Sequence, residues 1–191
     1  MNLFIKQFII VILLITTFLA VYFGSIAPFV KAKSFISLLI GMQNVTTLEG
    51  LTSLFDKSVK FYSPVGDEET IKYLNDEVMK IISQEEKHEI VDRTIVNYVE
   101  PYWQQNNIRH VLAAAQMYVF LWEKYGDENA YLKAEEYYKK SLVLGPRLPW
   151  TLYSLFNLYQ KHGEIEKTKE IGEIILKYWP GDEKVREILN L

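Results

Sequence analysis

The stretch YLKAEEYYKKSLVLGP, residues 131–146, decides how this chain folds. Residues of one helix face recur along it at spacings of three and four: Ala134, Tyr138, Ser141 and Leu142. Gly145-Pro146 then ends the helix, because proline lacks the amide hydrogen that a helix interior requires. A second proline, Pro180, follows in GEIILKYWPGD (172–182). The interval from Pro146 to Pro180, which we call the repeat interval, indicates a repeating unit.

The segment before this helix supplies the other half of the unit. Its apolar residues also follow a helical period, and GDEN (126–129) is predicted to be a turn. A shift by the repeat interval superimposes large apolar residues or proline at five positions: Tyr118 on Leu152, Leu121 on Leu155, Trp122 on Phe156, Tyr125 on Tyr159 and Pro146 on Pro180. KHGE (161–164) is the second predicted turn, with Gly163 at the position of Asn129. The sequence therefore predicts two successive helix–turn–helix units.

This pattern resembles the tetratricopeptide repeat, a helix–turn–helix unit of about 34 residues. The matching residues are Leu121, Tyr125, Ala134, Tyr138 and Pro146 in the first unit and Leu155, Tyr159, Gly163 and Pro180 in the second. Trp122 and Phe156 depart from the usual glycine, and Thr168 and Gly172 replace the small and aromatic residues of the second helix. The resemblance implies a right-handed α–α superhelix, because one hairpin cannot cover its own apolar face. Coincidental spacing in a pair of ordinary helical hairpins is the alternative.

The resemblance also implies a place for a ligand, since the first helix of each tetratricopeptide hairpin lines a concave groove. The partner-binding residues implied by register are Gln116, Glu123, Trp150, Tyr153, Asn157 and Gln160, together with Val119. Tyrosine and tryptophan are favoured anchors in protein recognition. The family's peptide-clamping members carry lysine where this chain has Val119 and Tyr153, which weakens the case for a carboxylate ligand. Packing of Trp150 and Tyr153 against the preceding hairpin is the competing interpretation.

The N-terminus predicts a membrane anchor. FIIVILLITTFLAVYF (8–23) carries no charge, and residues 3–23 are long enough to span a bilayer. A signal peptide would have a shorter apolar region and a better cleavage site than the one before Pro28; a buried core helix is the third possibility. Lysines flank both ends, so the positive-inside count is nearly balanced. We expect a single-pass membrane protein whose body lies outside the cytoplasm.

No stretch of the chain shows sustained alternation of period two, so an all-α fold is predicted. A capping box, Thr46-x-x-Glu49, opens a helix, and SPVGD (63–67) and SQEEK (83–87) separate further helices. The expected domains are an anchor over 1–27, degenerate or capping hairpins over 28–107, and tetratricopeptide-like repeats with a C-terminal capping helix over 108–191.

The residues offer little for catalysis. The chain of 191 residues has no cysteine, and its three histidines lie in separate segments, where surface positions are expected. Neither H-E-x-x-H nor a glycine-rich phosphate loop occurs. After residue 33 there are 18 basic and 24 acidic residues, which argues against a nucleic-acid partner. We expect no enzyme activity, no cofactor and no metal.

The order of parts is similar to the C-terminal region of bacterial O-antigen ligase-like membrane proteins, in which an apolar span precedes a helical repeat tail. The similarity rests on that order and on Pro28, Ala32 and Lys33. It implies, as an alternative, an accessory or detached tail of a glycan-transferring enzyme. The function expected first is a membrane-anchored scaffold that binds a protein or peptide partner at the cell envelope.

Overall fold

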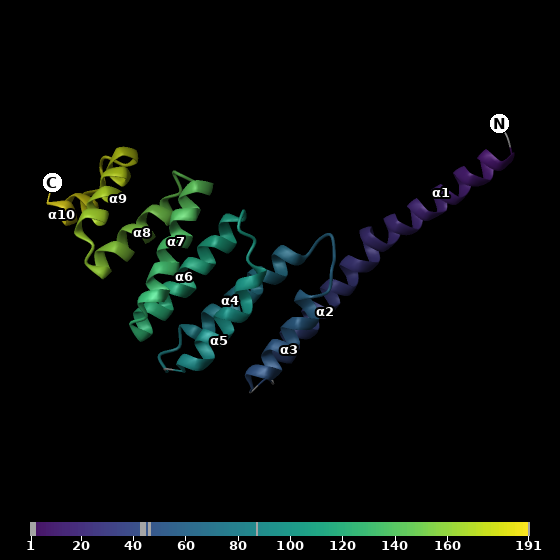
Figure 1. Cartoon of the computed structure of the whole chain (residues 1–191), viewed down its shortest axis with the longest axis horizontal. Coiled ribbons are helices and arrows are strands. Elements are labelled where there is room, and N and C mark those ends of the chain that lie inside the picture. The colour runs from purple at the N-terminus through teal and green to yellow at the C-terminus, as the bar shows by residue number, and fades with distance from the viewer. Residues whose placement is uncertain (1–2, 43–44, 46, 87, 191) are drawn as a thin grey trace. The chain divides into compact units, whose positions relative to one another are not determined.

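A computed structural model describes residues 3–42, 45, 47–86 and 88–190. The described residues form helices and connecting segments without any strand, so the all-α prediction is confirmed for them (Figure 1). The chain divides into two compact units, residues 1–77 and residues 78–191.

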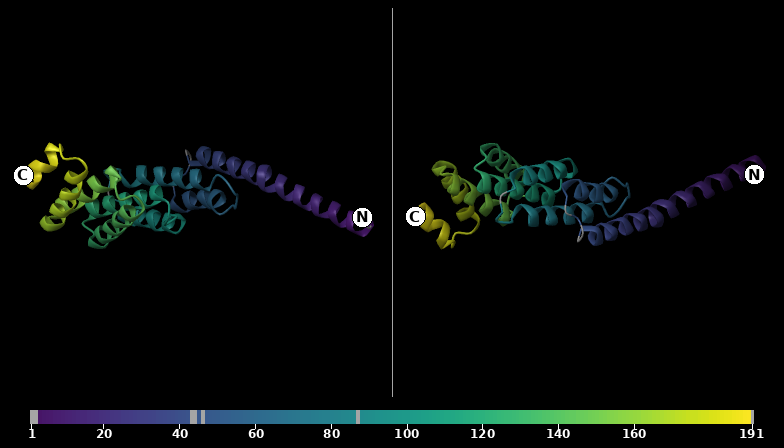
Figure 2. Two further views of the ribbon diagram at one scale, coloured as in Figure 1. Left: turned by 90° about the horizontal axis from the view of Figure 1, so that it is seen from above. Right: turned by 90° about the horizontal axis from the view of Figure 1, so that it is seen from below.

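The first unit begins with a long continuous helix. Helix α1 (Leu3–Val21) passes through a π-helical turn, η1 (Tyr22–Ile26), into α2 (Ala27–Met42), and both views of Figure 2 show one unbroken rod. The wide turn lies just before Pro28, which cannot donate to the preceding turn. The stretch from Phe4 to Met42 is long and apolar enough to cross a membrane, and its most apolar window is not buried. Helix α1 is therefore not a core helix of the described structure.

One further helix and most of the next follow α2 in this unit. Helix α3 (Leu48–Val59) packs against α2 and begins at Thr47, whose side chain accepts a hydrogen bond from the Gly50 amide at 3.1 Å. The predicted capping box began at Thr46, which lies outside the described residues. The segment between α3 and α4 (Asp67–Ile82) is tied to α2 by buried Lys31, which donates to the Phe61 carbonyl at 2.9 Å and pairs with Asp67 at 2.6 Å.

The second unit is a series of helices in which each packs against the next. The sequence runs through α5 (Glu89–Val99), a 3-10 turn η2 (Glu100–Tyr102), α6 (Ile108–Tyr125), α7 (Glu128–Leu144), α8 (Pro149–His162), α9 (Ile165–Tyr178) and α10 (Glu183–Leu189). Contacts join α5 to α6, α6 to α7, α7 to α8, α8 to α9 and α9 to α10. Fully buried apolar side chains such as Val111, Ala114, Leu155 and Ile175 form the core. Helix α5 ends just before Pro101, which lies in the 3-10 turn η2.

The two hairpin turns do not recur at the repeat interval. Helices α7 and α9 end at Leu144 and Tyr178, which are one repeat interval apart, but α6 and α8 end at Tyr125 and His162, which are further apart. The left-handed residue that ends α6 is Gly126 (φ 68°), and Gly163 (φ 85°) ends α8. Asn129, the residue predicted to correspond to Gly163, lies inside α7. That prediction was wrong because α8 continues for about one more helical turn before its glycine.

Two tyrosines separated by the repeat interval make corresponding hydrogen bonds. The Tyr125 hydroxyl donates to Asp92 of α5 at 2.6 Å, and the Tyr159 hydroxyl donates to Glu135 of α7 at 2.8 Å. Both carboxylates are buried and lie on the helix that precedes the tyrosine's own helix. Tyr159 is buried as expected, but Tyr125 is only half-buried. Each of these bonds fixes a first helix against the hairpin before it.

Candidate functional site

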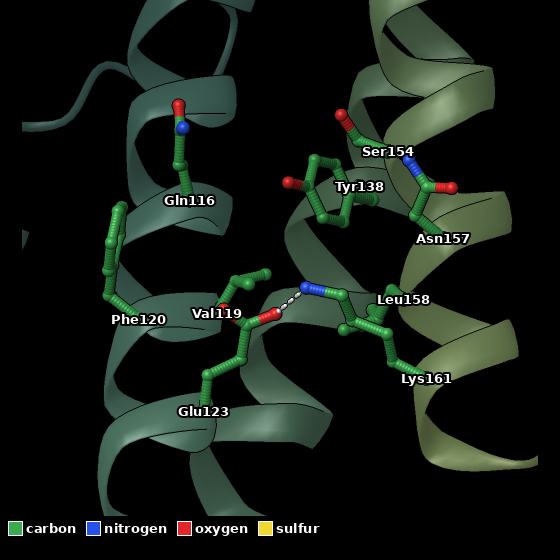
Figure 3. A pocket seen from close by; sticks show the side chains of 9 residues that line it. All are labelled: Gln116, Val119, Phe120, Glu123, Tyr138, Ser154, Asn157, Leu158 and Lys161. Carbon is green, nitrogen blue, oxygen red and sulfur yellow. Dashed lines mark hydrogen bonds and ion pairs between the residues drawn. The ribbon is translucent and has the colours of Figure 1, made fainter.

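A cavity of about 200 Å³ opens between α6 and α8 (Figure 3). Four of its lining residues come from α6, four from α8 and one from α7: Gln116, Val119, Phe120 and Glu123; Ser154, Asn157, Leu158 and Lys161; and Tyr138. The α6 residues are spaced by three, one and three, and so are the α8 residues. That spacing puts four side chains on one helix face. Two facing helix surfaces and a tyrosine of α7 therefore form one groove.

Polar groups of different kinds occupy the groove. In Figure 3 the side chains of Gln116, Ser154 and Asn157 lie toward one end, and the Lys161–Glu123 ion pair joins the two helices toward the other. The pair faces solvent, with Lys161 61% exposed. Each amide offers both a donor and an acceptor, which matches the N–H and C=O groups of a peptide backbone. The groove thus offers both hydrogen-bond donors and acceptors from its two facing helices.

Tyr138 of α7 lies between the two facing helices. The residue is buried, and this burial raises the pKa of its hydroxyl above the ordinary value. The neighbouring Ser154 side chain lowers that pKa, and the nearby Glu123 carboxylate raises it. The hydroxyl of Tyr138 can donate a hydrogen bond in the groove.

The groove contains four of the seven predicted site residues: Gln116, Val119, Glu123 and Asn157. The other three lie elsewhere on α8. Trp150 is 59% exposed at the start of that helix, and Gln160 is exposed near its end. The Tyr153 hydroxyl donates to Asp182, and its ring lies 5.9 Å from that of Trp179. Tyr153 thus holds the N-terminal cap of α10, and burial together with Asp182 raises its pKa to about 12.

Five lining residues were absent from the predicted site: Phe120, Tyr138, Ser154, Leu158 and Lys161. Helical spacing around Gln116 and Asn157 could have identified four of them, since Phe120 follows Gln116 by four and Lys161 follows Asn157 by four. Tyr138 carries no such signal. The helical period places Tyr138 on the core face of α7, and part of that face lines the groove.

Across the described ranges, no three histidine, cysteine, aspartate or glutamate residues come close enough to hold a metal ion. His88 is exposed, but His110 is buried and its Nδ1 accepts from the Gln104 amide at 3.1 Å. The prediction of three surface histidines was therefore wrong for His110, which fixes the segment before α6.

Comparison with protein-family models, curated proteins and solved structures finds no match for this chain.

Proposed function

We propose that this chain is a membrane-anchored scaffold that binds an extended segment of a protein partner in the groove between α6 and α8. The observation that carries the proposal is the pair of facing helix surfaces, each with a carboxamide and a charged side chain at the groove. Gln116 and Asn157 would bond to the main chain of the bound segment, while Val119, Phe120 and Leu158 contact its side chains.

The charges of the groove favour a bound segment without a terminal carboxylate. Lys161, the cation that lines the groove, already pairs with Glu123. A carboxylate entering there would have to displace Glu123, and it would then meet an unpaired acid. An internal, uncharged stretch of a partner protein fits this arrangement.

A tetratricopeptide-like superhelix is the arrangement we propose for the hairpins. Two findings support it: α7 and α9 end one repeat interval apart, and Tyr125 and Tyr159 donate to carboxylates on the preceding hairpin. In such an array, stacked first helices form a continuous binding face.

The anchor in this proposal is α1, with residues 3–23 in the bilayer. An α-helix of about 20 residues extends about 30 Å, the thickness of the hydrocarbon core. The groove would then act at the cell envelope, on the extracytoplasmic side. Because α1 is apolar and unburied along its length, lipid is the environment that suits its surface.

The test is co-purification from native membranes of the full-length chain and of a double variant, Gln116→Ala with Asn157→Ala. We expect the double variant to lose the partner while its melting temperature stays within a few degrees of the parent's. Gln160→Ala, an exposed amide on the same helix outside the groove, is the matched control and should retain the partner. Equal retention by all three proteins would contradict the proposal.

A further inference from the structure

The segment between α3 and α4 exposes apolar side chains. Its sequence, KFYSPVG (60–66), holds one charged residue, Lys60, which pairs with Asp56 at 2.7 Å. Tyr62 is 71% exposed and Val65 is 59% exposed, with Pro64 exposed between them. Exposed apolar residues grouped in one loop mark a contact surface.

This loop lies beside the junction of α1 and α2, as Figure 1 shows where the chain passes from α3 to α4. The Tyr62 ring lies 6.4 Å from the Phe23 ring in an edge-to-face arrangement. Phe23 in turn contacts Tyr22, with ring centroids 5.1 Å apart. Lys31 donates to the Phe61 carbonyl at 2.9 Å and pairs with Asp67, which holds both ends of the loop against α2. The position of the loop is therefore built into the fold.

The depth of Tyr62 follows from the length of α1. Residues 4–23 form about 30 Å of helix, so Phe23 lies at the boundary of the hydrocarbon core when α1 spans the bilayer. The Tyr62 ring packs on the Phe23 ring and lies at the same level. Tyrosine is enriched at this level, because its ring suits the acyl chains and its hydroxyl suits the headgroups.

We propose that residues 60–66 form a second membrane contact, in which Tyr62 and Val65 enter the boundary between headgroups and acyl chains. The proposal rests on the membrane anchor of the proposed function. Lipid is the occupant favoured here because the loop continues the apolar surface of α1 through Tyr22 and Phe23. Two attachments, a spanning helix and an interfacial loop, fix how the first unit is oriented on the membrane, which a single helix cannot do.

The test exploits the absence of cysteine from the chain, so that each introduced thiol is unique. The full-length protein, reconstituted in phosphatidylcholine vesicles, carries an environment-sensitive fluorophore at Val65→Cys or, independently, at Pro64→Cys. The matched control is Ser37→Cys, an exposed position in α2 that lies about 21 Å of helix beyond Phe23. Ile10→Cys in α1 reports on the anchor.

We expect labels at 64 and 65 to show blue-shifted emission and strong quenching by lipids with a nitroxide near the headgroup. The label at 37 should remain water-exposed and unquenched, and the label at 10 should be quenched by a nitroxide deep in the acyl chains. Equal quenching at 65 and 37, with strong quenching at 10, would overturn the loop proposal and leave the anchor intact. Absence of quenching at 10 would overturn the anchor itself.

Discussion

Replacing Glu135 by glutamine tests the polar contact that joins the last two hairpins. The buried Glu135 carboxylate of α7 accepts from the Tyr159 hydroxyl at 2.8 Å and pairs with Lys167 at 2.8 Å and Lys139 at 2.9 Å. Burial alone would raise the pKa of this carboxyl, but the three donors outweigh it and lower the pKa to about 2 from 4.5. The contact therefore stabilises the ionised form of Glu135 in the folded protein.

The size of the effect follows from that change in pKa. A shift of about 2.5 units corresponds to at most about 3 kcal/mol of unfolding free energy at pH 7, since each unit is worth about 1.36 kcal/mol. Screening by solvent reduces what Lys167 and Lys139 contribute to this free energy, because their side chains are 40% and 55% exposed. Because the folded pKa lies below the unfolded one, this stability is present above about pH 4.5 and is lost as the pH falls toward 2.

Urea unfolding of the detergent-solubilised chain, followed by tryptophan fluorescence, measures the effect. The four tryptophans, at positions 103, 122, 150 and 179, all lie in the second unit, so the signal reports on that unit. We expect Glu135→Gln to lower the unfolding free energy by about 2–3 kcal/mol at pH 7 and to reduce its pH dependence between 4.5 and 2. Glu136→Gln, at the exposed neighbouring position, should change the unfolding free energy by less than about 0.5 kcal/mol. Equal stability of Glu135→Gln and the parent at pH 7 would refute the reasoning.

Three further results are expected. Tyr159→Ala should lower the unfolding free energy by about 3–5 kcal/mol and Tyr125→Ala by clearly less, because Tyr159 is buried and Tyr125 is only half-buried. Equal losses of unfolding free energy in urea titrations of the two variants would contradict this expectation. Gly163→Ala should lower the unfolding free energy by about 1–2 kcal/mol, since its φ is 85°, whereas Gly181→Ala, with nothing within 4 Å of an added Cβ, should change little. Protease added to spheroplasts should digest the body of the protein if it lies outside the cytoplasm, and protection until lysis would reverse that topology.

The sequence was sufficient to predict most of the helices, because their apolar residues recur at a helical period and α6, α7 and α8 end at glycine. The C-terminal helix was also predicted, from Val185, Ile188 and Leu189. The effect of this helix on the position of Tyr153 was not predicted. The Asp182 cap of α10 accepts from Tyr153, which draws this tyrosine away from the groove, and no local pattern reveals a bond between residues so far apart in the chain.

Packing also explains a departure from the repeat pattern. Phe156 and Gly172 both break that pattern. A Cβ on Gly172 would lie 3.0 Å from Phe156 and 2.7 Å from Leu189, so these side chains fill the space that glycine leaves. Two exceptions that look independent in the sequence thus compensate each other in space. Only the three-dimensional structure can show such a pair.

The most direct test of the proposed binding role is photo-crosslinking from the groove in native membranes. A photoreactive amino acid replaces Asn157 in the full-length chain, and Lys169, exposed on α9 outside the groove, is the matched position. We expect a discrete crosslinked partner from position 157, none from position 169, and loss of the crosslink when Gln116→Ala is added. Absence of a crosslink from 157, or the same products from both positions, would contradict it.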